Sequence, residues 1–262
     1  MNQPLAYIHP EAKIANNVTI EPFVTIGKDV EIGEGTWIGS SATIMDGARI
    51  GKNCRIFPGA VISAIPQDLK FVGEITTAEI GDNTTIRECV TVNRGTKARG
   101  KTTIGSNCLL MAYVHIGHDC EIRDNIIIGN ASQLAGEVVI DDHAILSSSV
   151  LVHQFSRIGS HVMISGGTLV RKDVPPFVTA AHEPISYVGI NTIGLRRRQF
   201  SSETISNISA TYRILYSGIN FTNALLQIEE KILQSNERDE IIKFVRTSKR
   251  GIMKGNESLL EA

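Results

Sequence analysis

One aliphatic residue recurs at every sixth position along most of the chain. The frame begins at Ile8 and continues through Val170, and between these ends only Asp68, Glu74 and Ala98 depart from it. Neither the 3.6-residue period of an α-helix nor the two-residue alternation of a single strand produces a period of six over this length. A long internal repeat is typical of a solenoid, so the pattern predicts a stack of six-residue units.

Each six-residue unit is expected to form a short strand followed by a corner. The residue after the aliphatic position is often Gly, as at Gly27, Gly33 and Gly51, and we expect the turn to need the backbone freedom of glycine there. Four positions after the aliphatic residue the side chain is small or β-branched, as at Ala12 and Val18. Three units would make an 18-residue triangular coil, and successive coils would stack by parallel strand pairing about 4.8 Å apart. The aliphatic residues would then form one continuous core.

Two stretches interrupt the frame and then return to it in phase. They span residues 63–79 and 93–103 and read SAIPQDLKFVGEITTAE and NRGTKARGKTT. A segment that leaves a coil and rejoins it in phase is expected to be a loop that projects sideways. Because a solenoid has no cleft of its own, such loops are where the walls of a binding site can be built.

A helical spacing of apolar residues replaces the repeat after residue 176. It predicts helices over 202–217, 222–235 and 237–250, and Gly251 is expected to stop the last of them. Helices at this place would cover the open edge of a parallel solenoid, which otherwise invites aggregation.

The chain is therefore expected to divide into an all-β solenoid over residues 1–188, with the two loops, and a C-terminal α-helical domain over 189–262. Basic residues gather in the second region and just before it, where they form either a solvated face or a surface that steers an acidic partner. They are Arg171, Lys172, Arg196, Arg197, Arg198, Arg246, Lys249 and Arg250.

Composition narrows the function classes. The 262 residues carry a formal net charge of -1, which argues against nucleic-acid binding by bulk electrostatics. No apolar run is long enough to cross a bilayer, and the N-terminus lacks the basic-then-apolar order of a signal peptide. We therefore expect a cytoplasmic protein without stable membrane insertion.

The four cysteines are expected to be structural. They are Cys54, Cys89, Cys108 and Cys120, and they form no CxxC pair. Three of them fall on the interior position of the repeat. Buried thiols are therefore expected rather than disulfides or zinc ligands.

The register of the repeat places one histidine in a column with a glycine and a glutamine. Residues 18 apart lie one above another, so His118 stacks under Gly136 and Gly136 under Gln154. A general base and an unshielded backbone amide would then line one surface. This arrangement suits acyl transfer, in which the base deprotonates a hydroxyl and an N–H receives the developing oxyanion. His115 and Asp119 could position or charge-stabilise the imidazole.

The repeat resembles the hexapeptide transferase repeat over residues 8 to about 175. This resemblance implies that the coil is left-handed, against the right-handed rule for most parallel crossovers. Several segments in combination also resemble the UDP-N-acetylglucosamine O-acyltransferase family, nearly end to end. These segments are 66–70, 93–96, 115–120, 134–136, 152–155, 173–176, 189–191 and 194–198.

This resemblance implies transfer of a (3R)-3-hydroxyacyl group from acyl carrier protein to the 3-hydroxyl of UDP-N-acetylglucosamine, the first step of lipid A biosynthesis. It implies that His118 is the general base, that Asp119 holds it and that the Gly136 amide forms the oxyanion hole. It also implies a homotrimer whose sites lie between subunits, and flat prism faces bury well against each other.

The same resemblance assigns the substrate-binding residues. The acyl chain length is measured at Gly166, where the missing side chain should favour longer acyl groups. The sugar-nucleotide loop and the uridine, phosphate and acyl regions are implied at Gln67, Asp68, Lys70, His115, His153, Gln154, Asn191, Arg197 and Arg198.

The sequence departs from the family pattern at three positions. Glu137 stands where His is usual, Ile193 where Glu is usual, and Asn93 where His is common. We expect catalysis to survive these changes, with effects on acceptor affinity and acyl preference.

Other functions predict different features. The solenoid carbonic anhydrases, which the coil also resembles, need three imidazoles with two in H-x4-H spacing, whereas His115 and His118 are H-x2-H. His143 and His161 share a column and are expected to be solvent-facing. The sequence lacks glycine-rich nucleotide loops and any local Ser or Cys nucleophile signature. We therefore expect neither a metal nor a cofactor.

Two further alternatives remain. The N-acyltransferase of the same pathway shares the coil, the base and the donor, but it usually carries an extra N-terminal uridine-binding domain. We expect none here because the repeats begin at Ile8. A non-catalytic scaffold would lose no activity on substitution of His118.

Overall fold

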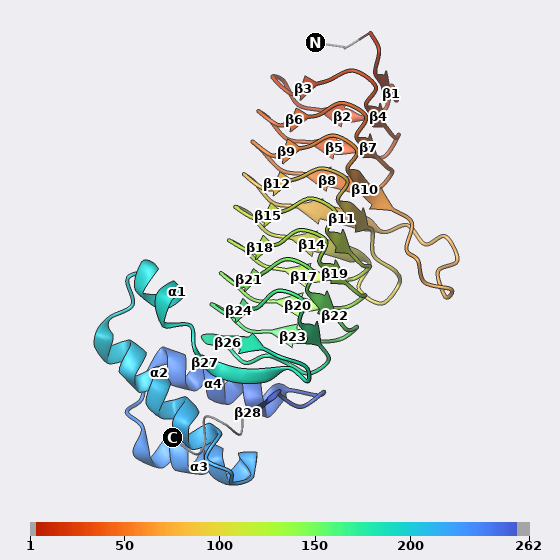
Figure 1. The fold of residues 1–262 in the computed structure, drawn as a ribbon. Helices are drawn as coiled ribbons and strands as arrows, with labels where there is room; N and C mark the ends of the chain where they lie inside the picture. The colour runs from red at the N-terminus through yellow and green to blue at the C-terminus, as the bar shows by residue number, and fades with distance from the viewer. Residues whose placement is uncertain (1–3, 256–262) are drawn as a thin grey trace.

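The computed structural model describes residues 4–255, which form a left-handed parallel β-helix capped at one end by helices (Figure 1). The coil has three faces, and each face is a sheet, here called sheet A, sheet B and sheet C. Each strand pairs with the strand one coil away, so His115 lies beside Gln133 and Ile116 beside Leu134. This 18-residue register is the one that the six-residue period predicts.

Most strands are two residues long, because each face of the triangle is short. Sheet A contains β1 (Tyr7–Ile8), β4 (Thr25–Ile26), β7 (Thr43–Ile44), β10 (Val61–Ala64), β13 (Thr91–Asn93), β16 (His115–Ile116), β19 (Gln133–Leu134), β22 (Leu151–Val152) and β25 (Leu169–Val170). Sheet B contains β2 (Lys13–Ile14), β5 (Glu31–Ile32), β8 (Ala48–Ile50), β11 (Thr77–Ile80), β14 (Lys101–Ile104), β17 (Glu121–Ile122), β20 (Val139–Ile140) and β23 (Arg157–Ile158). Sheet C contains β3 (Thr19–Ile20), β6 (Trp37–Ile38), β9 (Arg55–Ile56), β12 (Thr85–Ile86), β15 (Leu109–Leu110), β18 (Ile127–Ile128), β21 (Ile145–Leu146), β24 (Met163–Ile164), β26 (Val178–Ala181), β27 (Ser186–Ile190) and β28 (Lys254–Gly255).

The aliphatic frame forms the predicted core. Ile38, Ile56 and Ile86 are fully buried on top of one another in sheet C, and the other two faces repeat this arrangement. The cysteines on the interior position are buried free thiols, as predicted, and burial raises the pKa of Cys108 to about 11 and that of Cys120 to about 12. Cys89, which is off that position, is exposed.

The corner glycines serve a different purpose from the predicted one. The left-handed backbone lies two residues after them, at φ +53° for Asn53 and +59° for Asp119. Gly33 itself has no positive φ, but a Cβ there would lie 2.7 Å from the carbonyl carbon of Gly51 in the next coil. Close approach of stacked corners, and not backbone freedom, therefore requires these glycines.

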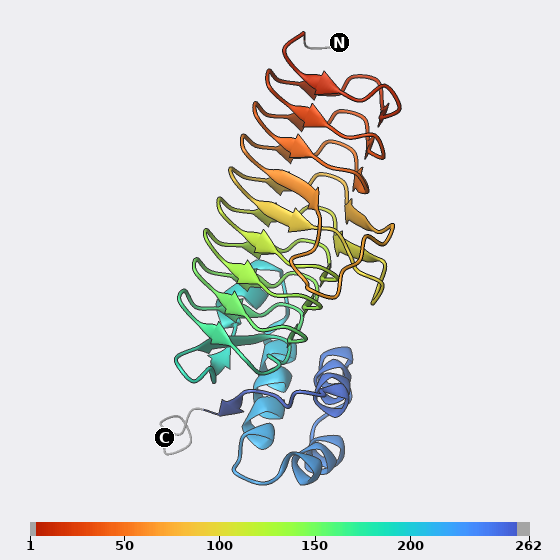
Figure 2. The same cartoon turned by 90° about the vertical axis from the view of Figure 1, so that its right-hand side faces the viewer.

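Both interruptions are sideways loops, as predicted. The first leaves sheet A after β10 and returns at β11, and the second connects β13 to β14. Both project from the same side of the coil (Figures 1 and 2). The strands on either side of the loops still pair in phase, with Val61 beside Thr91 and Thr91 beside His115, and the register shifts only between Ile62 and Ala64 at the start of the first loop.

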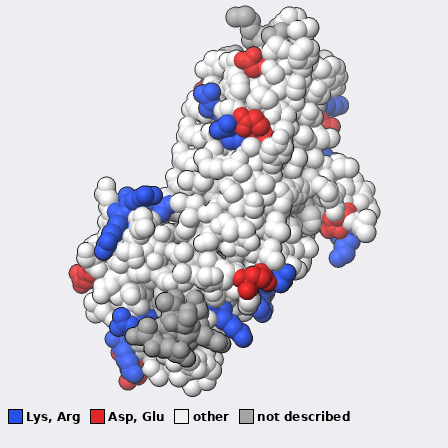
Figure 3. All heavy atoms as spheres, viewed as in Figure 1, with Lys and Arg blue, Asp and Glu red and all other residues white. Residues whose placement is uncertain are grey.

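The C-terminal region contains the three predicted helices and a short one that the spacing did not predict. They are α1 (Thr192–Arg197), α2 (Ser202–Leu215), α3 (Phe221–Lys231) and α4 (Asn236–Thr247), of which α1 is the addition. Before them, β26 and β27 form an antiparallel pair that ends sheet C. The helices cover the end of the coil (Figure 1), and Lys and Arg side chains gather over α1 (Figure 3). Among the helices of residues 4–255, none has the length and apolar character to span a membrane.

Candidate active site

His118 and Asp119 lie at the corner between sheets A and B. His118 follows β16, and its Nδ1 lies 2.8 Å from Asp119 Oδ2. The Asp119 side chain is completely buried, while that of His118 is 12% exposed. Because a carboxylate only accepts hydrogen bonds, this contact places the proton on Nδ1 and leaves the Nε2 lone pair free. The imidazole is therefore oriented as a base.

Gly136 lies one coil above His118, as the register predicted. The Glu137 N–H donates to the His118 carbonyl at 2.9 Å, and the Phe155 N–H donates to the Gly136 carbonyl at 3.2 Å. Gln154 therefore occupies the same corner one coil further. A Cβ on Gly136 would overlap the ring of His118 at Nε2. Within residues 4–255 the Gly136 N–H donates to no other group, so it is available beside the base.

The first loop carries a carboxylate to the base. Asp68 Oδ2 lies 3.7 Å from His118 Nε2, and Asp68 Oδ1 accepts the backbone N–H of Lys70 at 2.9 Å. The side chains of Gln67 and Lys70 are exposed on the same loop. Of these three predicted residues, Asp68 is the one that the structure brings to the base.

His115 and His153 lie near the column with different environments. His115 Nδ1 lies 2.7 Å from Thr91 Oγ1, and burial lowers the pKa of His115. His153 is exposed, with its Nδ1 3.0 Å from the Gln154 carbonyl oxygen. A hydrogen bond to that carbonyl requires Nδ1–H as the donor.

The remaining predicted residues lie elsewhere on the chain. Asn191 caps α1, because its Oδ1 accepts the Gly194 N–H at 3.1 Å while its Nδ2 donates to the His161 carbonyl at 2.9 Å. Arg198 donates to the His143 carbonyl at 3.0 Å, at the corner between sheets B and C. A single chain therefore does not bring these residues to His118.

Gly166 and Arg197 also lie apart from His118. A Cβ on Gly166 would lie 3.1 Å from the Ser148 carbonyl oxygen, between β24 and β25 and thus toward the corner of sheets C and A. Arg197 is exposed in the last turn of α1.

His143 and His161 form a stacked pair, as their shared column predicted, but His161 is not solvent-facing. Their ring centroids are 4.8 Å apart, and His161 also stacks on Phe177 and meets Phe200 edge-on. Burial, with the charges of His143 and Arg198 adding to it, lowers the pKa of His161 to about 4. The pair fastens α1 and the segment after it to the coil.

The three departures from the family pattern occupy distinct places. Glu137 is half-buried directly after Gly136 and adopts φ +60°. Ile193 is 69% exposed on α1. Asn93 is buried, and its Nδ2 donates to the Ile65 carbonyl at 3.2 Å, which ties the two loops together.

Sequence reasoning missed the residues that surround Asp119. The second loop folds over this carboxylate, and its donors are the Thr96 N–H, the Thr96 hydroxyl and the Arg99 N–H. The loop itself was visible as a break in the repeat. The sequence did not show that the loop covers Asp119, because no periodicity links residues across an irregular segment.

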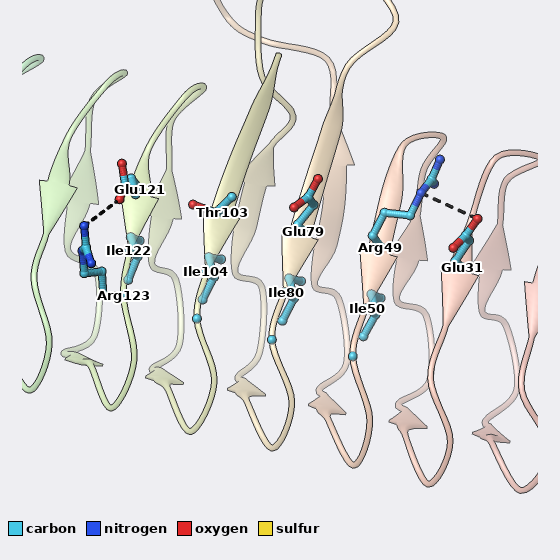
Figure 4. A pocket seen from close by; sticks show the side chains of 13 residues that line it. Glu31, Arg49, Ile50, Glu79, Ile80, Thr103, Ile104, Glu121, Ile122 and Arg123 are labelled. Carbon is cyan, nitrogen blue, oxygen red and sulfur yellow. Dashed lines mark hydrogen bonds and ion pairs between the residues drawn. The ribbon is translucent and has the colours of Figure 1, made fainter. Parts of the chain in front are cut away.

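A separate hollow of about 540 Å³ runs along sheet B (Figure 4). Its floor is made by isoleucines and glycines, and charged side chains such as Arg49, Glu31, Glu121 and Arg123 stand along it in ion pairs. None of the predicted site residues lines it. Among residues 4–255, no three His, Cys, Asp or Glu side chains are grouped so that they could hold a metal ion.

Comparison with known proteins places the chain among the acyltransferases. Residues 101–136 match the bacterial transferase hexapeptide model, and residues 173–253 match the model of UDP N-acetylglucosamine O-acyltransferase, domain 2. Residues 2–97 match the model of the GMPPB C-terminal domain.

Individual relatives agree with these matches. The chain is 59% identical over 74% of its length, and 74% of the relative, to the acyl-[acyl-carrier-protein]–UDP-N-acetylglucosamine O-acyltransferase of Chlorobaculum parvum. It is 56% identical over 95% of its length, and 93% of the relative, to the enzyme of that name from Sulfurihydrogenibium sp.. The crystal structure of a UDP-N-acetylglucosamine acyltransferase from Bacteroides fragilis covers 97% of this chain and matches over 100% of its own, with 56% identity and a TM-score of 0.96. The chain belongs to the UDP-N-acetylglucosamine O-acyltransferase family.

Proposed function

We propose that this protein transfers a (3R)-3-hydroxyacyl group from acyl carrier protein to the 3-hydroxyl of UDP-N-acetylglucosamine, the first step of lipid A biosynthesis. Relatives of 56–59% identity bear the name of this O-acyltransferase. The observation that carries the proposal is the geometry of His118, whose Nδ1 faces a buried carboxylate while its Nε2 lies against Gly136 and faces the loop carrying Asp68.

In the proposed mechanism, His118 Nε2 takes the proton of the acceptor hydroxyl as its oxygen attacks the thioester carbonyl carbon. The negative charge that develops on the carbonyl oxygen is bound by the Gly136 N–H. The tetrahedral intermediate then expels the thiolate of the carrier protein. That thiolate takes the proton from the imidazolium, which restores the base.

Asp119 has two roles in this mechanism. It fixes the Nδ1–H tautomer, so that Nε2 is the basic nitrogen, and it stabilises the positive charge of the imidazolium after proton transfer. Because its side chain is fully buried, water does not compete for this contact. We propose that Asp68, whose carboxylate lies 3.7 Å from His118 Nε2, binds the acceptor sugar with Gln67 and Lys70 of the same loop.

We further propose that the site is completed in a cytoplasmic homotrimer. Asn191, Arg197 and Arg198 lie on or next to α1, away from His118 of their own chain. A neighbouring subunit would bring this basic segment to the sugar-nucleotide phosphates, with His115, His153 and Gln154 lining the same region.

We propose that the acyl chain extends from His118 of one subunit toward Gly166 of a neighbouring subunit. Gly166 carries no side chain, and a Cβ there would lie 3.1 Å from the Ser148 carbonyl oxygen. The absence of a side chain at this position supports the proposal that longer acyl groups are accepted.

Purified protein given UDP-N-acetylglucosamine and 3-hydroxyacyl carrier proteins of several lengths tests the proposal. We expect turnover with at least one donor, and His118→Ala should lower kcat by about 10²- to 10⁴-fold, the usual contribution of a general base. His182→Ala, which removes an exposed histidine outside the site, is the matched control and should retain full activity. No turnover with any donor, or an unimpaired His118→Ala variant, would refute the proposal.

A further inference from the structure

The environment of Asp119 differs from that of its counterparts in the next coils. Asp119, Glu137 and Phe155 occupy equivalent corner positions and share a left-handed backbone, with φ of +59°, +60° and +67°. Asp119 is nevertheless 0% exposed, whereas Glu137 is half-buried and Phe155 is 49% exposed. A corner side chain is therefore open to solvent unless something covers it, and the second loop is what covers Asp119.

The loop covers Asp119 with hydrogen-bond donors and not with apolar groups. The Thr96 N–H lies 3.0 and 3.1 Å from its two carboxylate oxygens, and the Arg99 N–H lies 3.1 Å from Oδ1. The Thr96 Oγ1 lies 2.7 Å from Oδ2, the oxygen that also accepts from His118. From below, the Thr102 hydroxyl accepts the Asp119 N–H at 2.8 Å. A buried carboxylate with this many donors is rotationally fixed.

The direction of the Thr96 hydroxyl is itself set by the loop. The Ala98 N–H donates to Thr96 Oγ1 at 3.1 Å, so that oxygen already accepts one hydrogen bond. Its hydrogen is then directed toward Asp119, which as a carboxylate can only accept. Thr96 is only 6% exposed, so neither partner of this hydrogen bond is open to bulk water.

We propose that Thr96 is a positioning residue for the acyl transfer. Its hydroxyl holds the Asp119 carboxylate in the one orientation that keeps the proton of His118 on Nδ1 and the lone pair on Nε2. The inference rests on the proposed function for its catalytic consequence, but the tautomer of His118 can be measured without any substrate. The second loop thereby gains a specific purpose: it turns an ordinary solenoid corner into a buried carboxylate that orients the base.

Thr96→Val tests the proposal, because valine keeps the shape of threonine and removes the hydroxyl. We expect kcat to fall about tenfold, the size of the effect of one hydrogen bond to a charged group. The KM values for both substrates should stay unchanged, since Thr96 is buried behind Asp119. In ¹⁵N NMR spectra of the histidine rings, the Nε2–H tautomer of His118 should become populated. Thr96→Ser, which restores the hydroxyl, should recover both kcat and the wild-type tautomer.

Thr76→Val is the matched control. Thr76 is similarly buried, and its hydroxyl donates to the Gly95 carbonyl of the second loop, but among the described residues no hydrogen bond joins it to Asp119. If Thr96 only anchors the loop, both valine variants should behave alike, and that result overturns the proposal. An unchanged His118 tautomer in Thr96→Val also overturns it. If the wild-type protein acylates no acceptor, the proposed function fails, while the tautomer comparison still decides the role of Thr96.

Discussion

The space above the imidazole of His118 is filled by nothing larger than the hydrogen of Gly136. A methyl group there would overlap the ring at Nε2. We therefore expect Gly136→Ala to lower kcat more than about 100-fold, because the base is displaced from its working position. The free energy of unfolding should fall by only about 1–3 kcal/mol, as is usual for one added methyl in a packed site.

Gly27→Ala is the control for this substitution. A Cβ on Gly27 would lie 2.5 Å from Asp46 Oδ1, so the variant is crowded to a similar degree but lies far from His118 along the coil. Steady-state kinetics and chemical unfolding of both variants separate the two effects. Equal losses of kcat in the two variants would contradict a specific role for Gly136.

At the same scale, His161 gives the stability of the protein a pH dependence. Its pKa in the folded protein is about 4, below the ordinary value of about 6.5, so the folded state binds fewer protons than the unfolded state between these values. The neutral His161 therefore contributes fully to the free energy of unfolding above about pH 6.5, and this contribution is lost as the pH falls toward 4. His143 and Arg198 add to this effect, because an imidazolium at His161 would be repelled by both.

Thermal unfolding of the wild type and of His161→Phe between pH 7.5 and pH 4.5 measures this effect. Phenylalanine can stack on His143 and Phe177 without taking up a proton. The melting temperature of the variant should fall less steeply with acid than that of the wild type. The exposed His182 serves as a control, since His182→Gln should leave the slope unchanged. If the melting temperatures of all three proteins fell equally steeply with acid, His161 would not be the source of the pH dependence.

On the scale of single elements, α1 depends on one side chain for both its start and its attachment to the coil. Asn191 accepts the Gly194 N–H and donates to the His161 carbonyl. Asn191→Ala should therefore lower the free energy of unfolding by about 2 kcal/mol, because the helix loses its cap and the segment loses its hydrogen bond to the coil. If α1 presents Arg197 and Arg198 to the sugar nucleotide, the KM for UDP-N-acetylglucosamine should rise as well.

Asn220→Ala is the corresponding change at α3. Asn220 is exposed and caps that helix through the Asn223 N–H at 2.9 Å, and within residues 4–255 its side chain makes no hydrogen bond to the coil. Asn220→Ala should lower the free energy of unfolding by about 1 kcal/mol and leave the KM for UDP-N-acetylglucosamine unchanged. Calorimetry and initial-rate kinetics on the two variants provide the comparison. A raised KM in Asn220→Ala, or an unaltered one in Asn191→Ala, would argue against α1 as a binding element.

Elements with a strong local signal were predictable from the sequence. The strands follow from the aliphatic frame, and α2 begins where Ser201 accepts the N–H of Thr204, a cap that the chain shows as Ser before an amphipathic stretch. The helix α1 was missed because it has six residues and buries only Leu195, too little for a helical period to stand out. The column of His118 and Gly136 was predictable because it follows from counting along an unbroken repeat. The burial of Asp119 was not, because it depends on how an irregular loop folds back.

On the scale of the whole molecule, the distribution of predicted site residues over three separate corners leads to a test of assembly. Light scattering should give a mass of three chains of 28.5 kDa each. His118→Ala and Arg197→Ala trimers should each be nearly inactive. When they are dissociated, mixed in equal amounts and reassembled, about a quarter of the wild-type activity should return, because a quarter of the shared sites then receive both intact residues.

Mixing without dissociation is the control for that experiment and should restore nothing. If each site lay within one chain, reassembly would also restore nothing, since every chain carries one defect. A monomeric mass would contradict the shared site directly.

The stacking register of the coil also limits how such a protein can change over time. Strand neighbours are separated by 18 residues in the unbroken part of the chain, as for Gln133 and Leu151. Gain or loss of a whole coil moves everything beyond it by about 4.8 Å and keeps every column intact. Gain or loss of a single six-residue unit would instead turn the rest of the molecule onto a different face, and between His118 and Gly136 it would separate the histidine from its glycine. The distance between the base and the helical cap can therefore be altered only in coarse steps, and fine adjustment is left to single side chains and to the two loops.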